Sequence, residues 1–230
     1  MTGKLFTKNM KLAEIIHADC RLLYVLPRFG IKLGFGDATI IDVCKKYGVD
    51  ENLFTLICNI YAFDDYVPKI CDIYNIPLEG IMLYLKKSHS DYLNKRIPHI
   101  IQHVEYLAGE HHTREQSIIE QFCESYKREV IAHFSYEEEV VFPYINSLIN
   151  KCANQQFKID DFLDNHSNIE DKLNDLKSII MKYVEPYSDN DANSDLLIDL
   201  FQLDDDLKRH TIIEEKILVS LVEIMEQSNK

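Results

Sequence analysis

Residues 133–143 read HFSYEEEVVFP and residues 210–218 read HTIIEEKIL, and these two stretches decide the fold. Both place a glutamate four residues after a histidine. The pairs are His133 with Glu137 and His210 with Glu214. Side chains four residues apart lie on one face of an α-helix, one turn above the other. Each stretch is therefore predicted to be helical and to offer an imidazole and a carboxylate to the same metal ion.

Two single histidines extend the pattern. His89 lies 44 residues before His133, and His166 lies 44 residues before His210. The whole set recurs with an offset of 77 residues, from 89 to 166, from 133 to 210 and from 137 to 214. Such a repeat indicates two halves of one site, with four imidazoles and two carboxylates inside a helical bundle.

The composition also favours long helices. The chain of 230 residues has only 7 Gly and 6 Pro, which argues against many tight turns. Apolar periodicity predicts four long helices, at residues 79–108, 113–150, 158–184 and 194–227. Because short connections favour antiparallel neighbours, we expect an all-α fold, an antiparallel up-down-up-down four-helix bundle in residues 79–230. The polar stretch YSDNDAN, residues 187–193, is predicted to be a loop, and Pro143 is predicted to bend its helix.

A small helical domain is predicted ahead of the bundle, in residues 1–66, with a connector at residues 67–78. Thr39 is expected to open a short helix that Gly48 ends, and Asp50 is expected to cap the next helix. The connector belongs to a stretch that contains two prolines and has no clear period.

The two glutamates fall in the middle of apolar helix stripes. On the second bundle helix the expected stripe is Phe122, Tyr126, Val130, His133, Glu137, Val140, Tyr144 and Leu148. Burying a carboxylate without a partner costs several kcal/mol, so it normally requires a cation. A pair of metal ions supplies that cation. Mixed nitrogen and oxygen ligation suits iron or manganese, with zinc as a further candidate. The alternative is a polar core in which each glutamate bonds a histidine or tyrosine.

Three further acids and one further histidine stand near this pattern. Glu129 and Asp206 each lie four residues before a ligand histidine and are again 77 residues apart. Glu170 lies one turn after His166. These acids either orient the ligands, line a channel to the site, or are solvated surface acids. His103 lies 14 residues beyond His89, about 21 Å along the helix, and so belongs to no common site.

Charge and cysteine content exclude several classes of function. The net charge is −13, and all of it falls beyond residue 75, which disfavours nucleic acid and anionic membranes as partners. No apolar run is long enough for a membrane span or a signal peptide, so we expect a cytoplasmic protein. The six cysteines form no C-x-x-C pair. They are predicted to be mostly free, buried thiols.

With the helices placed, residues 79–227 resemble a hemerythrin-like domain. The motifs that carry the resemblance are HSDYLNKRIP at residues 89–98, the two His/Glu stretches and the lone His166. The third helix of hemerythrin brings two histidines one turn apart, whereas this chain has Glu170 at the second position. The set of four histidines and two glutamates is similar to that of bacterial di-iron proteins that repair iron centres. Residues 28–50 resemble the small domain that precedes the bundle in that family, but the adjacent cysteines usual there are replaced by Leu33, Gly34 and Phe35.

The resemblance implies a non-haem centre of two iron ions, oxo- or hydroxo-bridged, in a protein of the oxidative or nitrosative stress response. It implies repair of iron–sulfur clusters or iron donation. The partners would be damaged iron–sulfur proteins or iron acceptors, together with O2 and NO. In that interpretation His89 and His133 help hold one ion, and His166 and His210 the other, while Glu137 and Glu214 bridge them. Whether the protein turns over a substrate is left open.

Other functions compete with this one. A diatomic-gas or iron sensor that signals through the N-terminal domain fits the missing cysteine pair. Residues 39–61 have the rhythm of a helix–turn–helix, but they lack a basic recognition helix, which disfavours transcriptional regulation. Oxygen storage is disfavoured by the missing fifth histidine. The Tyr- and Phe-rich N-terminal segments have two candidate partners, the bundle or a second copy in a homodimer.

Overall fold

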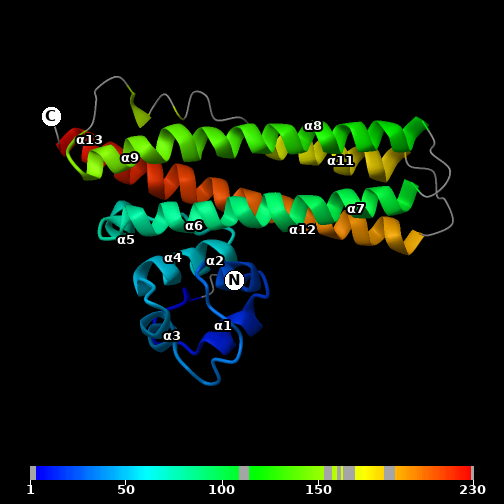
Figure 1. Cartoon of the computed structure of the whole chain (residues 1–230). Helices are drawn as coiled ribbons and strands as arrows, with labels where there is room; N and C mark the ends of the chain where they lie inside the picture. Colours follow the sequence, from blue (N-terminus) through cyan, green and yellow to red (C-terminus); the bar gives the residue numbers. More distant parts are fainter. Residues whose placement is uncertain are drawn as a thin grey trace. The chain divides into compact units, whose positions relative to one another are not determined.

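The computed structural model is helical throughout most of the chain that it describes, namely residues 4–108, 114–152, 157–159, 162, 169–183 and 190–228 (Figure 1). Within these residues the β pairing is limited to an isolated bridge between Lys11 and Thr39. The all-α prediction is therefore confirmed. The chain divides into two compact units, one made of residues 1–88, 145–159 and 209–230, the other of residues 89–144 and 160–208.

Long helices occupy the second part of the chain, several of them interrupted by a π-helical turn. Their bounds are α6 Leu78–Asp91, η1 Tyr92–Arg96, α7 Ile97–Ala108, α8 Arg114–Tyr136, η2 Glu137–Val141, α9 Phe142–Ile149, α11 Ile169–Tyr183, α12 Asn190–Ile213, η3 Glu214–Val219 and α13 Ser220–Ser228. The predicted helices at 79–108 and 113–150 are confirmed. The predicted helix at 158–184 is confirmed from Ile169 to Tyr183. Lys158 is not helical, and much of the segment between Lys158 and Ile169 lies outside the described residues.

The last bundle helix begins earlier than predicted. It starts at Asn190 rather than at residue 194, so the loop prediction was wrong for residues 190–193. Asn and Asp suit the first turn of a helix as well as a loop, because their acceptors and negative charge face the free backbone N–H groups there. Asp191 lies in that first turn.

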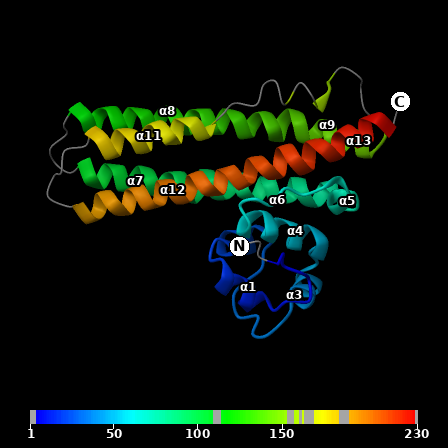
Figure 2. The ribbon, with the colours of Figure 1, turned by 180° about the vertical axis from the view of Figure 1, so that it is seen from behind.

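One apolar core joins α7, α8, α11 and α12 in the second unit, where successive helices run in opposite directions (Figures 1 and 2). Each helix buries residues three or four positions apart, the pattern of a bundle core. The members include Ile97, Ile100 and Val104 from α7, Tyr126 and Val130 from α8, Leu173 and Leu176 from α11, and Leu196, Leu200, Leu203 and Leu207 from α12. The predicted four-helix bundle is confirmed in this unit.

The apolar stripe of the second bundle helix shifts by one residue past Glu137. Val140 was expected in the core but is exposed, and Val141 and Ile145 are buried instead. The cause is η2, because a π-helical turn holds one more residue than an α-turn and so rotates everything that follows. Sequence periodicity assumes an unbroken α-helix and therefore missed Val141 and Ile145, although Leu148 is buried as predicted.

The N-terminal helices belong to the first unit, with bounds α1 Leu12–Ala18, α2 Leu22–Arg28, α3 Ile40–Tyr47, α4 Glu51–Ala62 and α5 Ile70–Ile73. Thr39 and Asp42 form a capping box at the start of α3, and Gly48 ends that helix with φ 67°. Asp50 caps α4 by accepting hydrogen bonds from the N–H groups of Asn52 and Leu53 at 2.9 and 2.8 Å. The predicted helix boundaries at these positions are confirmed.

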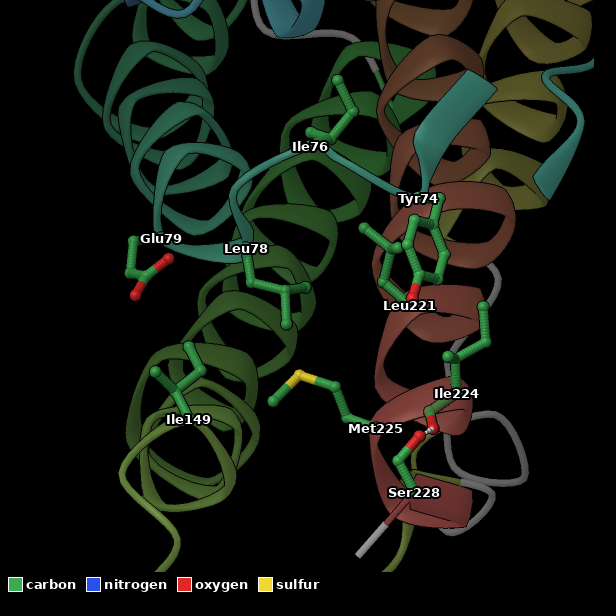
Figure 3. A pocket seen from close by; sticks show the side chains of 9 residues that line it. All are labelled: Tyr74, Ile76, Leu78, Glu79, Ile149, Leu221, Ile224, Met225 and Ser228. Atoms are coloured by element: carbon green, nitrogen blue, oxygen red, sulfur yellow. Dashed lines mark hydrogen bonds between the residues drawn. The ribbon is translucent and has the colours of Figure 1, made fainter. Parts of the chain in front are cut away.

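The first unit also contains a pocket of about 450 Å³. Figure 3 shows its lining: Tyr74, Ile76, Leu78, Glu79, Ile149, Leu221, Ile224, Met225 and Ser228. The Ser228 hydroxyl donates a hydrogen bond to the Ile224 carbonyl. Because the walls are mostly aliphatic and contain no histidine or cysteine, this pocket lacks the donor set of a transition-metal site.

No described helix combines the length and apolarity that crossing a membrane requires. The cysteines are divided equally between interior and surface: Cys44, Cys58 and Cys123 are buried, and Cys20, Cys71 and Cys152 are exposed. All six are free thiols, as predicted, but the expectation that most are buried was wrong. Cys20 and Cys152 lie between or beyond helices and Cys71 lies in the four-residue helix α5, which is too short for periodicity to predict burial.

Candidate metal centre

Three of the predicted ligands, His89, Glu137 and Glu214, lie at or just before the points where the described helices change from α to π geometry. η1 begins three residues after His89, η2 begins at Glu137 and η3 begins at Glu214. A π-helical turn widens the helix and redirects the side chains at its start, and such turns are frequent at functional sites. Glu137 and Glu214 therefore have the same local backbone position, the first residue of a π-helical turn, as the 77-residue repeat predicts.

Glu137 is the centre of the first half of the site. It is only 1% exposed, and each of its carboxylate oxygens faces an imidazole nitrogen. The distance is 3.0 Å from Oε2 to Nε2 of His89 and 2.9 Å from Oε1 to Nε2 of His133. Both histidines are buried. The structure thus brings together the three ligands that the sequence assigns to this half.

A second carboxylate contacts the other ring nitrogen of His89. Its Nδ1 lies 2.8 Å from Oε1 of Glu138, an arrangement in which Nδ1–H donates to the carboxylate. The Nε2 atom then directs its lone pair at Glu137. Two lone pairs at 3.0 Å repel each other unless a proton or a cation lies between them. The geometry is therefore suited to a metal ion.

Aromatic rings enclose the same imidazole. Phe134 is stacked on His89 with ring centroids 4.0 Å apart and planes inclined by 7°, and the Phe142 ring is nearly parallel at 6.1 Å. Tyr92 is fully buried and donates a hydrogen bond to the backbone carbonyl of Asp206 at 3.3 Å. Apolar walls lower the local dielectric, which strengthens the attraction between the carboxylates and a cation.

The other predicted His/Glu pair lies within the first unit. His210 and Glu214 are 2% and 1% exposed, and Nε2 of His210 lies 2.7 Å from Oε1 of Glu214. Like His89 and Glu137, these two side chains are buried and have ligand atoms suited to a metal ion. The remaining predicted ligand, His166, lies outside the described residues.

Comparison with protein families matches residues 84–222, more than half of the chain, to the hemerythrin HHE cation-binding domain. The chain belongs to the hemerythrin HHE cation-binding family. The matched range begins before His89 and ends after Glu214, so it contains all six predicted ligands. A search of curated proteins finds no significant match.

The donor set of this HHE domain fits a metal ion of the iron class. The described part supplies three imidazoles and two carboxylates, all buried. A purely hydrogen-bonded core would require a proton on a buried imidazole or carboxyl group to neutralise the charge. Neutral imidazoles with carboxylates and a cation need no such protonation, and mixed nitrogen and oxygen ligation suits iron.

The three outer acids of the HHE domain have different surroundings. Glu129 forms an ion pair with Lys172, and both side chains are more than 40% exposed. Asp206 is 1% exposed, on the turn before His210. The Glu170 side chain lies outside the described part of the chain. The assigned roles of these acids stay predictions.

Sequence reasoning missed Glu138 and the aromatic enclosure. Glu138 stands in the run EEE at 137–139, where helical periodicity turns it away from the face of Glu137. It contacts His89 from a different helix, and only the packing of two helices reveals that contact. Phe134, directly after His133, was likewise off the stripe used to find the ligands.

Proposed function

We propose that the chain is a non-haem di-iron protein. In this proposal His89, His133 and Glu137 form one half of the site, and His166, His210 and Glu214 form the other. The observation that carries it is Glu137, a buried carboxylate with an imidazole nitrogen within 3.0 Å of each oxygen. Membership of a cation-binding family and the 77-residue repeat support extending the same arrangement to the second half.

The charges of the ligands and the groups around them suit two bound iron ions. Two carboxylates against two divalent ions leave a positive site, which a bridging oxide or hydroxide would neutralise further. When bound, iron supplies redox chemistry and open coordination positions for small ligands such as O2 and NO. Glu138 holds the Nδ1 proton of His89 and so keeps Nε2 available as a ligand atom. Phe134 packs over the same ring and limits the access of water.

The physiological role proposed is a response to oxidative or nitrosative stress, through repair of iron–sulfur clusters or donation of iron to an acceptor. The set of four histidines and two glutamates supports this role, because Glu170 replaces the second third-helix histidine of hemerythrin. The missing fifth histidine disfavours storage of oxygen. Manganese and zinc remain the competing metals.

Metal analysis tests the centre. Protein purified without oxygen and reconstituted with ferrous iron should retain about two irons per chain, as di-iron bundle proteins do. Fewer than one iron per chain would overturn the di-iron proposal. The role is tested separately, by incubating loaded protein with an enzyme whose iron–sulfur cluster NO has damaged. Failure to restore the activity of that enzyme in the presence of a reductant would contradict the repair role but would not bear on the di-iron centre.

A sensor is the second candidate, and one set of contacts within the first unit favours it. Arg28 on α2 donates to the Tyr61 hydroxyl on α4 at 2.7 Å, and Tyr84 on α6 donates to Tyr61 at 3.2 Å. All three side chains are buried. Tyr84 lies five residues before His89 on the same helix. A shift of α6 at the metal would therefore reach the N-terminal helices directly.

Limited proteolysis discriminates the sensor from the repair protein. If the N-terminal helices respond to the metal, oxidation of the iron-loaded protein should change the rate of cleavage within residues 64–78. A Tyr84→Phe variant should weaken this response, because it removes the hydroxyl that links α6 to α4. Identical cleavage of the oxidised and reduced forms would argue against a sensor.

A further inference from the structure

A second cluster of histidines and acids lies on the surface of the bundle unit. His99 and His103 are one turn apart on α7, and Asp195 and Asp199 are one turn apart on α12. Together with Gln102 and Ile198 they line a hollow of about 490 Å³. Each helix therefore presents two potential ligands at the four-residue spacing that places side chains on one face.

Asp199 is the point at which these side chains converge. Its Oδ2 atom lies 3.3 Å from Nδ1 of His99 and 3.5 Å from Nδ1 of His103. The two imidazole rings are 6.2 Å apart between centroids. One carboxylate oxygen is thus within reach of both imidazoles, and Asp195 borders the same hollow.

The Nδ1 atom of His103 is buried and makes no hydrogen bond within the described part of the chain. A buried nitrogen without a partner is uncommon in native structures and calls for an explanation. The Asp199 carboxylate lies 3.5 Å from this nitrogen but does not accept a hydrogen bond from it. A cation between the imidazole and the carboxylate would satisfy both groups.

We propose that His99, His103, Asp195 and Asp199 bind one divalent transition-metal ion of the zinc class. Two imidazoles and two carboxylates form a four-ligand set of the kind that zinc and cobalt accept in tetrahedral geometry. The two negative charges balance a divalent cation. His99 is 67% exposed, so it has the freedom to rotate toward an incoming ion.

This site is separate from the buried centre and does not depend on the proposed function. His103 lies 14 residues beyond His89, about 21 Å along the helix axis. The surface set also differs in access, because its hollow opens to solvent whereas His89 and Glu137 are buried. The acidic charge of the chain favours the approach of cations to such an open site.

Titration with Co²⁺ tests the site, since the visible spectrum of Co²⁺ reports tetrahedral ligation. Full-length protein is first saturated with iron under anaerobic conditions and then titrated. We expect one Co²⁺ per chain beyond the metal already held. His99→Ala and Asp199→Asn should each weaken this Co²⁺ binding at least about tenfold, with the iron content unchanged.

The controls make the result specific to these residues. His99→Ala is expected to fold normally because the side chain is mostly exposed, and circular dichroism checks this. His17→Ala removes an exposed histidine elsewhere and should leave the Co²⁺ titration unchanged. Absence of a Co²⁺ site in iron-loaded protein, or a titration that neither site variant alters, would overturn the proposal. Loss of iron binding alone would count against the di-iron centre only.

Discussion

A substitution at Glu137 can distinguish a metal centre from a hydrogen-bonded polar core. Its carboxylate is buried between the Nε2 atoms of His89 and His133. If a cation balances this charge, Glu137→Gln should reduce the metal content to less than half, while the apoprotein remains as stable as the wild type or gains stability. A buried charge without its counter-ion is costly, and the amide removes it. Metal analysis and urea denaturation of the apoprotein measure the two effects.

Glu139→Gln is the matched control, because Glu139 is an exposed acid two residues further along. It should leave both the metal content and the stability unchanged. If Glu137→Gln instead destabilises the apoprotein by several kcal/mol and the metal content does not change, the glutamate serves as the anion of buried imidazolium ions.

The cysteines provide a second prediction. Burial, with smaller contributions from nearby acids, raises the pKa of Cys44 and of Cys123 to about 12, and burial raises the pKa of Cys58 well above its usual value. The thiolate is the reactive form, so at pH 8 roughly one part in ten thousand of a thiol with that pKa is reactive. Only the exposed thiols, Cys20, Cys71 and Cys152, should react rapidly with an alkylating reagent.

Mass spectrometry counts the labelled thiols. Three should react within minutes in the folded protein, and all six after unfolding in urea. Rapid labelling of Cys44 in the folded protein would show that the first unit opens easily. It would also reopen the question of thiol chemistry in a domain that lacks the adjacent cysteines of the repair family.

At the scale of single residues, spacing alone located Glu137 and Glu214 and predicted that both are buried. Four-residue spacing is a property of one helix, so the sequence contains it. The contact between Glu138 and His89 joins residues 49 positions apart on two helices. No periodicity within a helix encodes such a contact, and it became visible only when the helices were packed together.

Prolines explain two of the three π-helical turns. Pro98 and Pro143 each follow the residue that closes such a turn, where the N–H of Ile97 donates to Tyr92 and that of Phe142 to Glu137. A proline inside a helix lacks a donor and clashes with the carbonyl four residues before it, and a wider turn relieves that clash. The sequence analysis predicted a bend at Pro143 rather than an added residue, and it made no prediction at Pro98. No proline follows η3.

At the scale of a helix, the cap of α4 gives a further prediction. The Asp50 carboxylate accepts two backbone hydrogen bonds at the start of α4, at 2.9 and 2.8 Å. Asp50→Ala should lower the free energy of unfolding of the first unit by about 1 kcal/mol. Urea denaturation followed by circular dichroism measures this change. Asp65→Ala, which removes an exposed acid outside any helix, should have no comparable effect. Equal stability of the two variants would contradict the role assigned to the cap.

At the scale of the whole molecule, the sequence predicted the helices better than the arrangement around the site. Long amphipathic segments fix the bundle, because each must bury its apolar stripe against others. The Tyr84–Tyr61–Arg28 contacts were not predictable in the same way, because they are a few buried polar groups on helices whose packing the sequence does not specify. The boundaries of the N-terminal domain and its connector stay predictions.

Removal of the metal is the test that involves the entire chain. A ligand that binds only the folded state stabilises it by RT ln(1 + [L]/Kd), which is about 4 kcal/mol at a thousand times Kd. Part of this stabilisation comes from the buried carboxylates Glu137 and Glu214, whose charge a bound cation would balance. Chelation should therefore lower the melting temperature by several degrees, and added ferrous iron should restore it. Scanning calorimetry at fixed pH measures both steps.

Glu137→Gln should show a much smaller difference between the melting temperatures of its metal-loaded and metal-free forms, whereas Glu139→Gln should match the wild type. A melting temperature unaffected by chelation would mean that protonated groups already balance the two carboxylates without a metal ion, and it would contradict the metal centre.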